Sequence, residues 1–405
     1  MKIAIAHGWG WQVGGVEGYL RELIPELLRN GHEVAFGYER ASFSDQIYWP
    51  DSIPSFDLSL GGTKGLDGFI EWGADINYLH IVQDVNIWKR ILCSGPCIYF
   101  AHSYMMTCVS GRKCHRFPRM EVCQKQFGWS CLMHYFPRGC GGKNPWTMLR
   151  DFYKNASLLK SLRRCRLVIT HSKHMQEEMG RHVGLEKVRV IPFCLPEATP
   201  APDVAEVGGV IANSILFLGR IESEKGADYL LRSIPFILPD IRDSLRVVMA
   251  GTGSMMNYCK MLASQMQERF PMVSFEFPGW LEGDAKIKAF QQASVFAMPS
   301  IWPEPLGMAP LEAMSMGVPV AGFNRGGFCE YVKNGENGYL APEPVSPEGL
   351  AKAINACLLN RDVQKRLGLC AMETSKQFSV RSHVLQLTQL FHGVLIQNKT
   401  SPQST

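Results

Sequence analysis

The sequence predicts an α/β protein in which two doubly wound domains face each other across a cleft. Three observations carry this prediction. The chain has 405 residues, which is more than one ordinary hydrophobic core supports. Short apolar runs alternate with helical patterns, as expected for parallel strands that helices cover on both faces. This series occurs twice, on either side of a proline-rich stretch that is typical of an interdomain linker.

Nine apolar runs are the expected strands of these two Rossmann-like domains. The runs of the first half are KIAIAHG, HEVAFGY, PCIYFAH and RLVITHS, and those of the second half are SILFLGR, RVVMAGTG, VSFEFPG, SVFAMPS and VPVAGF. We therefore expect an N-terminal domain over residues 1–196, a linker over 197–210 and a second domain over 211–378. Residues 379–405 form a C-terminal helix and tail. Val384, Leu387, Phe391 and Val394 share one face of this helix, which could pack back on the N-terminal domain.

The composition limits the class of protein. Hydrophobic residues make up 46% of the chain and charged residues 20%, which is typical of a globular protein. No apolar run reaches the roughly 20 residues that span a bilayer. The N-terminus MKIAIAHGWG is short and turns at glycine, so it is interpreted as a first strand and not as a secretory signal. These features predict a cytoplasmic location.

A glycine-rich turn follows the first strand. The dinucleotide fingerprint Gly-x-Gly-x-x-Gly requires a third glycine. After Gly8 and Gly10, that place is occupied by Val13, so the segment lacks the fingerprint. Gly14 and Gly15 come just before a helix, where exposed amides could meet a phosphate or let a ligand approach closely. A tight strand-to-helix connection explains the same glycines equally well.

The second half carries a stronger set of polar residues. Arg220 directly follows a strand and Lys225 begins a helix, and two such cations can neutralise a diphosphate. The amides of Leu306, Gly307 and Met308 open another helix and predict an anion site. Glu304, just before the start of this helix, and Glu312, about two turns further along, can accept hydrogen bonds from hydroxyls. This set of residues suits a ligand that has hydroxyl groups at both ends and phosphates between them, which is the layout of a nucleotide sugar.

These motifs resemble those of the retaining glycosyltransferases of family four, also called glycosyltransferase group 1. The resemblance rests on GRIESEKG, VMAGTGS, FPGWLEGD, MPSIWPEPLGMAPLEAMSMGVPV and GENGYLAP, which occur in the order and spacing of that family. The Glu-x7-Glu signature is complete in Glu304 and Glu312. In the first half, GGVEGYLREL resembles the glycine loop of the family and YFAHS its strand-end histidine. The resemblance implies the GT-B fold.

The resemblance also implies a role for each matching residue. Glu304 is expected to hold hydroxyls of the transferred sugar and Glu312 those of the ribose. Arg220 and Lys225, with the amides of Gly307 and Met308, are expected to neutralise the leaving diphosphate, which stabilises charge that grows in the transition state.

His102 is expected to lie over the sugar, near the reacting centre, and Gly14 and Gly15 to line the donor site. No protein nucleophile is identified, no metal is expected at the diphosphate, and the nucleotide sugar is a co-substrate and not a cofactor. The implied activity is transfer of a sugar to an acceptor hydroxyl in glycan, polysaccharide or glycolipid assembly.

Residues 105–150 depart from the family pattern. Five of the 13 cysteines lie here, at positions 108, 114, 123, 131 and 140. Free buried thiols and a zinc site, with His115 and His134 as further ligands, both remain open, although no Cys-x-x-Cys pair supports zinc. Residues 112–166 contain thirteen Lys or Arg and two acidic residues. Their net charge is +11, whereas the net charge of the whole chain is +5.

Seven aromatic residues interleave with these charges: Phe117, Phe127, Trp129, Tyr135, Phe136, Trp146 and Tyr153. No nucleic-acid motif accompanies the basic residues, so nucleic acid is not the expected partner. An anionic membrane or a phosphorylated lipid acceptor fits this mixture better, which predicts a peripheral location at the inner face of the membrane. Arg112, Lys113, Arg116 and Arg119 are the expected contact charges.

Other functions of the same fold stay open at this point. A nucleotide-sugar epimerase or a phosphorylase would rearrange or release the sugar, and a non-catalytic partner subunit would only bind a glycan. The complete set of Arg220, Lys225, Glu304 and Glu312 argues against the last of these, because a subunit without chemistry does not need it.

Overall fold

The computed structural model of the chain divides into two compact units. The first comprises Met1–Arg119, Cys123–Glu197 and Ser379–Thr405, and the second comprises Met120–Val122 and Ala198–Phe378. The structure describes residues 1–10, 15–40, 53–195, 213–237 and 244–400. Gly14 and the whole of the expected linker, 197–210, lie outside these residues.

The first unit contains a seven-stranded sheet in which every neighbouring pair is parallel. Its strand order is β3-β2-β1-β4-β5-β8-β9, so the order reverses between β1 and β4. The strands are β1 (Lys2–Trp9), β2 (Glu33–Arg40), β3 (Ser55–Asp57), β4 (Ile76–Leu79), β5 (Cys97–Ala101), β8 (Leu167–Thr170) and β9 (Val188–Val190). Ligands of such sheets bind beyond the carboxyl ends of the strands, next to the reversal.

The helices of the first unit come from both ends of the chain. They are α1 (Gly15–Arg29), α2 (Leu66–Glu71), α3 (Val85–Ser94), α5 (Pro145–Leu162), α6 (Lys173–Val183) and α13 (Val380–Thr400). Helix α13 packs beside α1, where the hydroxyl of Tyr19 lies 2.7 Å from Nε2 of His383. Its apolar face is buried: Val384, Leu387, Phe391 and Val394 are at most 4% exposed.

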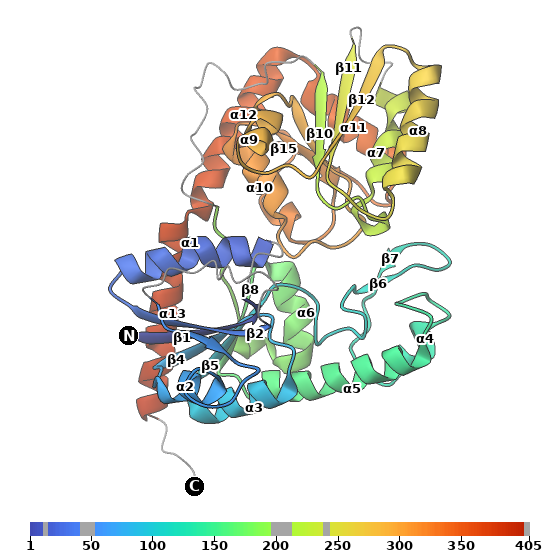
Figure 1. The fold of residues 1–405 in the computed structure, drawn as a ribbon. Helices are drawn as coiled ribbons and strands as arrows, with labels where there is room; N and C mark the ends of the chain where they lie inside the picture. The colour runs from blue at the N-terminus through green and yellow to red at the C-terminus, as the bar shows by residue number, and fades with distance from the viewer. Residues whose placement is uncertain (11–14, 41–52, 196–212, 238–243, 401–405) are drawn as a thin grey trace. The chain divides into compact units, whose positions relative to one another are not determined.

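The inserted segment of the first unit follows β5. It contains the strand β6 (Cys114–His115) and the short helix α4 (Ser130–Tyr135); β7 (Glu121–Val122), which pairs with β6, lies in the stretch Met120–Val122 that is counted with the second unit. Figure 1 shows α5 running from below the large sheet out to this segment. A small core of its own, formed by Val109, Tyr135, Met148 and Phe152, joins the segment to α5.

The second unit contains a six-stranded parallel sheet of order β12-β11-β10-β13-β14-β15. Its strands are β10 (Ser214–Leu218), β11 (Leu245–Ala250), β12 (Val273–Gly279), β13 (Val295–Met298), β14 (Val320–Phe323) and β15 (Gly338–Ala341). Its helices are α7 (Ala227–Ile237), α8 (Met256–Arg269), α9 (Gly283–Gln291), α10 (Met308–Ser315), α11 (Pro347–Leu358) and α12 (Arg361–Ser375). The strand order reverses between β10 and β13, which is where Arg220 and Glu304 follow their strands.

The two separate parallel sheets confirm the predicted fold class, and all nine predicted strands are present. Four sheet strands were missed: β3, β4, β9 and β15. Each has only three or four residues, and β4 contains the polar Asn77. Such short segments lack a sequence signal and become strands because a neighbouring strand pairs with them. Among the described residues, no helix is both long enough and apolar enough to span a membrane.

Candidate active site

Two loops at the reversal of the second sheet bring Lys225 and Glu304 together. The turn Ser223–Lys225 and the loop after β13 are joined by the carbonyl of Glu224, which accepts hydrogen bonds from the amides of Ile301 (3.0 Å) and Trp302 (3.1 Å). Gly226 has φ +66°, and a Cβ there would lie 1.9 Å from the carbonyl oxygen of Pro299. Only glycine fits this close approach without a backbone shift.

The carboxylate of Glu304 is buried, and its Oε1 is bound by the protein. Its Oε1 accepts hydrogen bonds from Nζ of Lys225 at 2.5 Å and from Oγ of Ser300 at 3.0 Å. Glu304 is only 5% exposed, and Nζ of Lys225 also lies 4.8 Å from the centre of the Trp302 ring. In the structure this cation is therefore neutralised by a neighbouring carboxylate, and a phosphate has to compete with Glu304 for it.

Arg220 differs from Lys225 in its surroundings. It is exposed two residues beyond β10 and makes no hydrogen bond or ion pair within the described residues. Its loop is held by the next one along the sheet edge: the amide of Ile221 donates to the carbonyl of Thr252 at 2.8 Å, and the amide of Ser254 donates to Glu222 at 3.0 Å. The guanidinium is thus carried on an anchored loop and is free to meet an anion.

The start of α10 offers main-chain donors. Gly307 precedes the helix with φ +87°, and the hydroxyl of Tyr331 donates to its carbonyl at 2.7 Å and to that of Leu306 at 3.2 Å. With these carbonyls held, the amides of Leu306, Gly307 and Met308 donate no hydrogen bond among the described residues. Free amides at a helix N-terminus favour an anion.

Glu312, on α10, is paired with a residue that the sequence did not indicate. Its Oε1 lies 2.6 Å from Nζ of Lys286 on α9, and both side chains are partly exposed. The Lys286 ammonium orients the carboxylate and leaves its second oxygen available to a ligand. Lys286 lies in a charged surface helix, which is an ordinary pattern, so only the fold shows its relation to Glu312.

In the first unit, His102 follows β5 and is 9% exposed. Its Nε2 lies 2.7 Å from Nδ1 of His80 and its Nδ1 lies 3.2 Å from Nε2 of His171. Both ring nitrogens are therefore engaged by other histidines. His80 and His171 were missed, although each directly follows a strand, as His102 does. Gly15 begins α1, and a Cβ added there would meet no atom within 4 Å.

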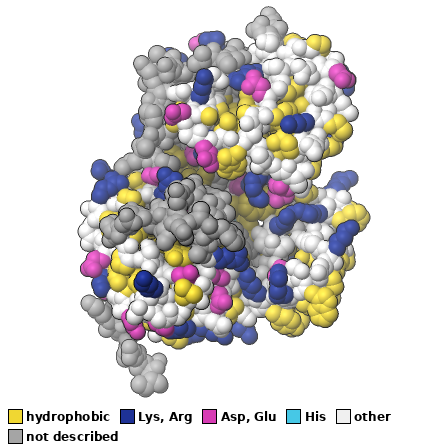
Figure 2. Space-filling model, in the orientation of Figure 1, with side chains coloured by type: hydrophobic (Ala, Val, Ile, Leu, Met, Phe, Trp, Pro, Cys, Tyr) yellow, Lys and Arg dark blue, Asp and Glu magenta, His cyan; other side chains and the backbone are white. Residues whose placement is uncertain are grey.

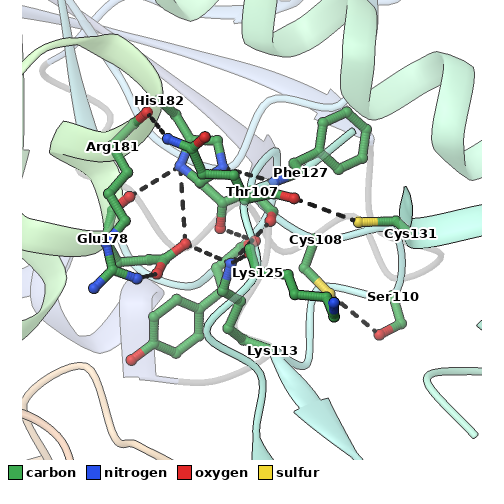
Figure 3. Close-up of polar contacts among 12 residues, drawn as sticks. Thr107, Cys108, Ser110, Lys113, Lys125, Phe127, Cys131, Glu178, Arg181 and His182 are labelled. Carbon is green, nitrogen blue, oxygen red and sulfur yellow. Dashed lines mark hydrogen bonds and ion pairs between the residues drawn. The ribbon is translucent and has the colours of Figure 1, made fainter. Parts of the chain in front are cut away.

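Lys113 is not part of a basic surface, so that prediction is wrong for this residue. It is 2% exposed, and its Nζ lies 2.5 Å from Oε1 of Glu178 on α6. The same ammonium donates to the carbonyls of Lys125 (2.6 Å) and Thr107 (3.4 Å) (Figure 3). The ion pair lies between α6 and the inserted segment, where burial makes pairing necessary for both charges.

His182 adds a second link between α6 and the segment (Figure 3). Burial, together with nearby cations, lowers the pKa of His182 to about 4. The neutral ring has Nδ1 2.9 Å from the Glu178 carbonyl, which can only accept, so Nε2 is the acceptor for the Phe127 amide at 3.0 Å. The inserted segment is thus anchored to α6 by charge and by hydrogen bonds.

Most of the other predicted contact residues of the segment do lie on the surface. The exposed aromatic side chains are Phe117, Trp129, Phe136, Trp146 and Tyr153, and Met133 joins them. Arg112, Arg116 and Arg119 are also exposed. Tyr135 and Phe127 instead pack in the core of the segment. Figure 2 shows hydrophobic and basic side chains gathered over α4 and the adjoining end of α5.

The cysteines of the segment are free thiols in the structure. Cys114 is buried and Cys108, Cys123, Cys131 and Cys140 are partly buried. Sγ of Cys140 lies 3.5 Å from Nδ1 of His115. In the described parts of the chain, no three His, Cys, Asp or Glu side chains are arranged so that they could hold a metal ion.

Two family models match the chain. The model described as glycosyl transferases group 1 matches residues 212–372, and the model described as Glycosyltransferase Family 4 matches residues 13–195. This chain belongs to the group 1 glycosyltransferases of family four. The family prediction made from the motifs is confirmed.

Known proteins similar to this chain include two curated relatives. An uncharacterised glycosyltransferase of Methanocaldococcus jannaschii is 37% identical over 144 residues, which cover 36% of this chain and 35% of the relative. The phosphatidyl-myo-inositol mannosyltransferase of Mycobacterium leprae is 27% identical over 185 residues, covering 45% of this chain and 47% of that protein. The chain thus spans about a third to a half of the length of these relatives.

Solved structures show the fold over nearly the whole chain. Anabaena HepE, crystallised in complex with UDP, aligns with a TM-score of 0.68 at 19% identity and covers 97% of this chain and 100% of HepE. HepE was also crystallised with UDP-glucose. A glycosyltransferase of Rickettsia africae aligns with a TM-score of 0.69 at 16% identity, covering 98% and 99% of the two chains. These alignments confirm the GT-B fold.

Proposed function

We propose that this glycosyltransferase moves a sugar, with retention of configuration, from a nucleotide-diphosphate sugar to an acceptor hydroxyl. The observation that carries the proposal is the convergence of Arg220, Lys225, Glu304 and the α10 amides at the strand-order reversal of the second sheet. Cations and free amides suit a diphosphate, and a carboxylate suits sugar hydroxyls. Because HepE was crystallised with UDP and UDP-glucose, a uridine nucleotide sugar is the first donor to test.

Each residue of the site has a distinct proposed role. Arg220 and the amides of Gly307 and Met308 bind the diphosphate, and Lys225 leaves Glu304 to neutralise it as the sugar departs. Glu304 then accepts hydrogen bonds from the sugar, and Glu312 binds the ribose. The further proposed ligands are His102 at the sugar and Gly14, Gly15 and Leu306 at the donor.

A donor panel tests this function. The protein is incubated with UDP-, GDP- and ADP-sugars, with and without glycan and lipid acceptors, while nucleotide release and sugar products are followed. Nucleotide release that depends on acceptor supports transfer. Sugar rearrangement without acceptor indicates an epimerase, release onto phosphate a phosphorylase, and binding without turnover a non-catalytic subunit.

We further propose that the acceptor is met at an anionic membrane surface, with the protein located at the cytoplasmic face. Exposed aromatic residues flank α4 (Trp129 and Phe136) and lie on α5 (Trp146 and Tyr153), and Arg112, Arg116 and Arg119 of the same segment are also exposed. Each such cation contributes roughly 1 kcal/mol at an anionic bilayer, within about a Debye length. The mycobacterial relative is itself named for phosphatidyl-myo-inositol.

Vesicle flotation tests this surface. The protein should float with vesicles of anionic lipid at low salt and remain behind with neutral vesicles. Reversing Arg112, Arg116 and Arg119 to Glu should abolish flotation and leave donor hydrolysis unchanged. Reversing the exposed Lys352, Arg361 and Lys365 of α11 and α12 changes the net charge equally and should have little effect. Parent protein that fails to float at low salt indicates a soluble acceptor instead.

A further inference from the structure

A row of histidines follows the carboxyl edge of the first sheet. His80, His102 and His171 are the first residues after β4, β5 and β8, which are neighbours in the sheet. His7 on β1 continues the row. The ring centres lie 6.2 Å apart from His7 to His80, 5.0 Å from His80 to His102 and 5.1 Å from His102 to His171.

The three inner rings form one hydrogen-bonded chain. His102 lies between His80 at 2.7 Å and His171 at 3.2 Å, and none of the three is more than 9% exposed. A neutral imidazole has one donor and one acceptor nitrogen, so the chain has a direction. Either His80 donates to His102 and His102 to His171, or both hydrogen bonds are reversed.

No protein group at the ends of the chain selects this direction. Nε2 of His80 and Nδ1 of His171 are buried and have no hydrogen-bond partner among the described residues. One end of the row therefore carries an N–H, and the other a lone pair, that no protein group among the described residues meets. This differs from His383, whose Nδ1 lies 2.7 Å from the Pro192 carbonyl and must donate to it.

Charged forms of the row are disfavoured by its surroundings. Burial holds the pKa values of His80, His102 and His171 well below the usual value, and neighbouring imidazoles add to this. The other titratable groups that face the row are Glu17 on α1, 2.8 Å from Nε2 of His7; Tyr19 and Tyr78, whose hydroxyls lie 3.3 Å apart; and His383 on α13.

We propose that the row donates in the direction from His80 to His171, so that His80 is a positioning residue that donates to Nε2 of His102 and holds it as the tautomer protonated on Nδ1. Of the two contacts of His102, the one to His80 is the shorter, so we take it as the contact that is kept when a sugar binds, with Nδ1 turning from His171 to a sugar oxygen. Nδ1 can donate to that oxygen only if it carries the proton, and it carries the proton when Nε2 accepts from Nδ1–H of His80. This inference rests on the proposed role of His102 at the sugar.

Nitrogen NMR of the whole protein labelled with 15N-histidine tests the tautomer without reference to activity. The protonated and bare ring nitrogens of a neutral imidazole have well separated resonances. We expect His102 to be neutral at pH 6 with the proton on Nδ1, with its signals assigned by their loss in His102→Asn. A charged ring, or a proton on Nε2, overturns the proposal even if no sugar is ever transferred.

Kinetics of two His80 variants test the consequence. His80→Leu removes the donor and should lower kcat about 10- to 100-fold, by analogy with the loss of the partner that orients a metal-bound histidine. KM for the donor should change little. His80→Asn places an amide N–H near the position of Nδ1 and should retain most of kcat. His32→Asn is the matched control, because His32 is also buried in this unit but bonds Thr388 at 3.1 Å.

The outcomes separate this inference from the proposed function. Unchanged kcat in His80→Leu, or equal losses in His80→Leu and His80→Asn, contradicts the positioning role. If the parent protein turns over no donor, the transfer proposal fails, whereas the NMR spectrum still decides the tautomer. If His80→Leu does not fold, the spectrum of the parent protein alone confirms or rejects the assignment.

Discussion

The ammonium of Lys225 lies 2.5 Å from the carboxylate of Glu304, which follows it 79 positions later in the chain. Both side chains are largely buried, at 17% and 7% exposure. This pair gives the two cations of the site different properties, because Lys225 is already neutralised whereas Arg220 has no partner in the described residues. Their substitutions should therefore have different effects.

Arg220→Ala should lower kcat by roughly 10² to 10³ and leave stability unchanged, because only the phosphate loses a partner. Lys225→Ala should lower kcat similarly and also destabilise the second unit, since a buried carboxylate remains unpaired. Kinetics and urea unfolding of both variants measure this. Adding Glu304→Gln to Lys225→Ala should restore stability but not turnover. If Arg220→Ala and Lys225→Ala have the same unfolding free energy, the Lys225–Glu304 pair does not stabilise the second unit.

Glu304 and Glu312 should be distinguished by ligand. Glu312→Ala is expected to weaken binding of the bare nucleotide diphosphate, because its proposed partner is the ribose. Glu304→Ala should weaken binding of the nucleotide sugar much more than binding of the bare nucleotide. Calorimetric titration of both ligands into both variants measures this, and the same loss in all four titrations shows that the assigned roles are wrong. Lys286→Ala should resemble Glu312→Ala, because Lys286 orients that carboxylate.

Gly226→Ala should separate the two loops of the donor site. The added methyl group would lie 1.9 Å from the Pro299 oxygen, at a residue with φ +66°. We expect a loss of about 1–3 kcal/mol in unfolding free energy, together with weaker nucleotide binding. Gly393→Ala is the control, because no atom lies within 4 Å of a Cβ there and the residue is exposed on α13. It should raise stability by about 0.5–1 kcal/mol.

Removing the buried cation of the inserted segment should destabilise the first unit. Lys113→Met leaves Glu178 with Arg181, whose side chain is 43% exposed, and should cost about 3–5 kcal/mol. The double variant Lys113→Met, Glu178→Leu should recover much of this loss. Arg119→Met removes an exposed charge nearby and should change stability by less than about 0.5 kcal/mol. Denaturant unfolding measures the unfolding free energy of all three variants. An unchanged unfolding free energy in Lys113→Met excludes the anchoring role.

Acid should destabilise the first unit through His383. Burial lowers the pKa of His383 to about 4, whereas the unfolded chain titrates near 6.5. Between these values the unfolded state binds more protons, so the contribution is complete above pH 6.5 and is lost as the pH falls toward 4. The difference corresponds to roughly 3 kcal/mol.

His383→Asn does not titrate, so its unfolding free energy should fall less between pH 7 and pH 4 than that of the parent, by about this amount. His80, His102 and His171 act in the same direction in both proteins, and their contribution therefore cancels in the comparison. The exposed His392 serves as a control, as His392→Asn should follow the parent curve. Parallel curves for His383→Asn and the parent contradict the assignment.

The sequence by itself determined the fold class, the family and the position of each motif relative to its strand. This was possible because the signals are local: a strand of four to eight apolar residues is followed at once by the loop that carries Arg220, His102 or Glu304. The short strands β3, β4, β9 and β15 escaped detection, whereas β8, β13 and β14, which also have four residues, were predicted from the apolar runs RLVITHS, SVFAMPS and VPVAGF.

Only the tertiary structure decided which charges pair and which are exposed. Lys225 meets Glu304 because β10 and β13 are neighbours in the sheet, and Lys286 meets Glu312 across two helices. Lys113 has the same local pattern as the exposed arginines around it, yet it is buried against Glu178. The histidine row likewise requires the order β4-β5-β8. Side-chain pairing depends on strand order and helix packing, which short-range sequence patterns do not encode.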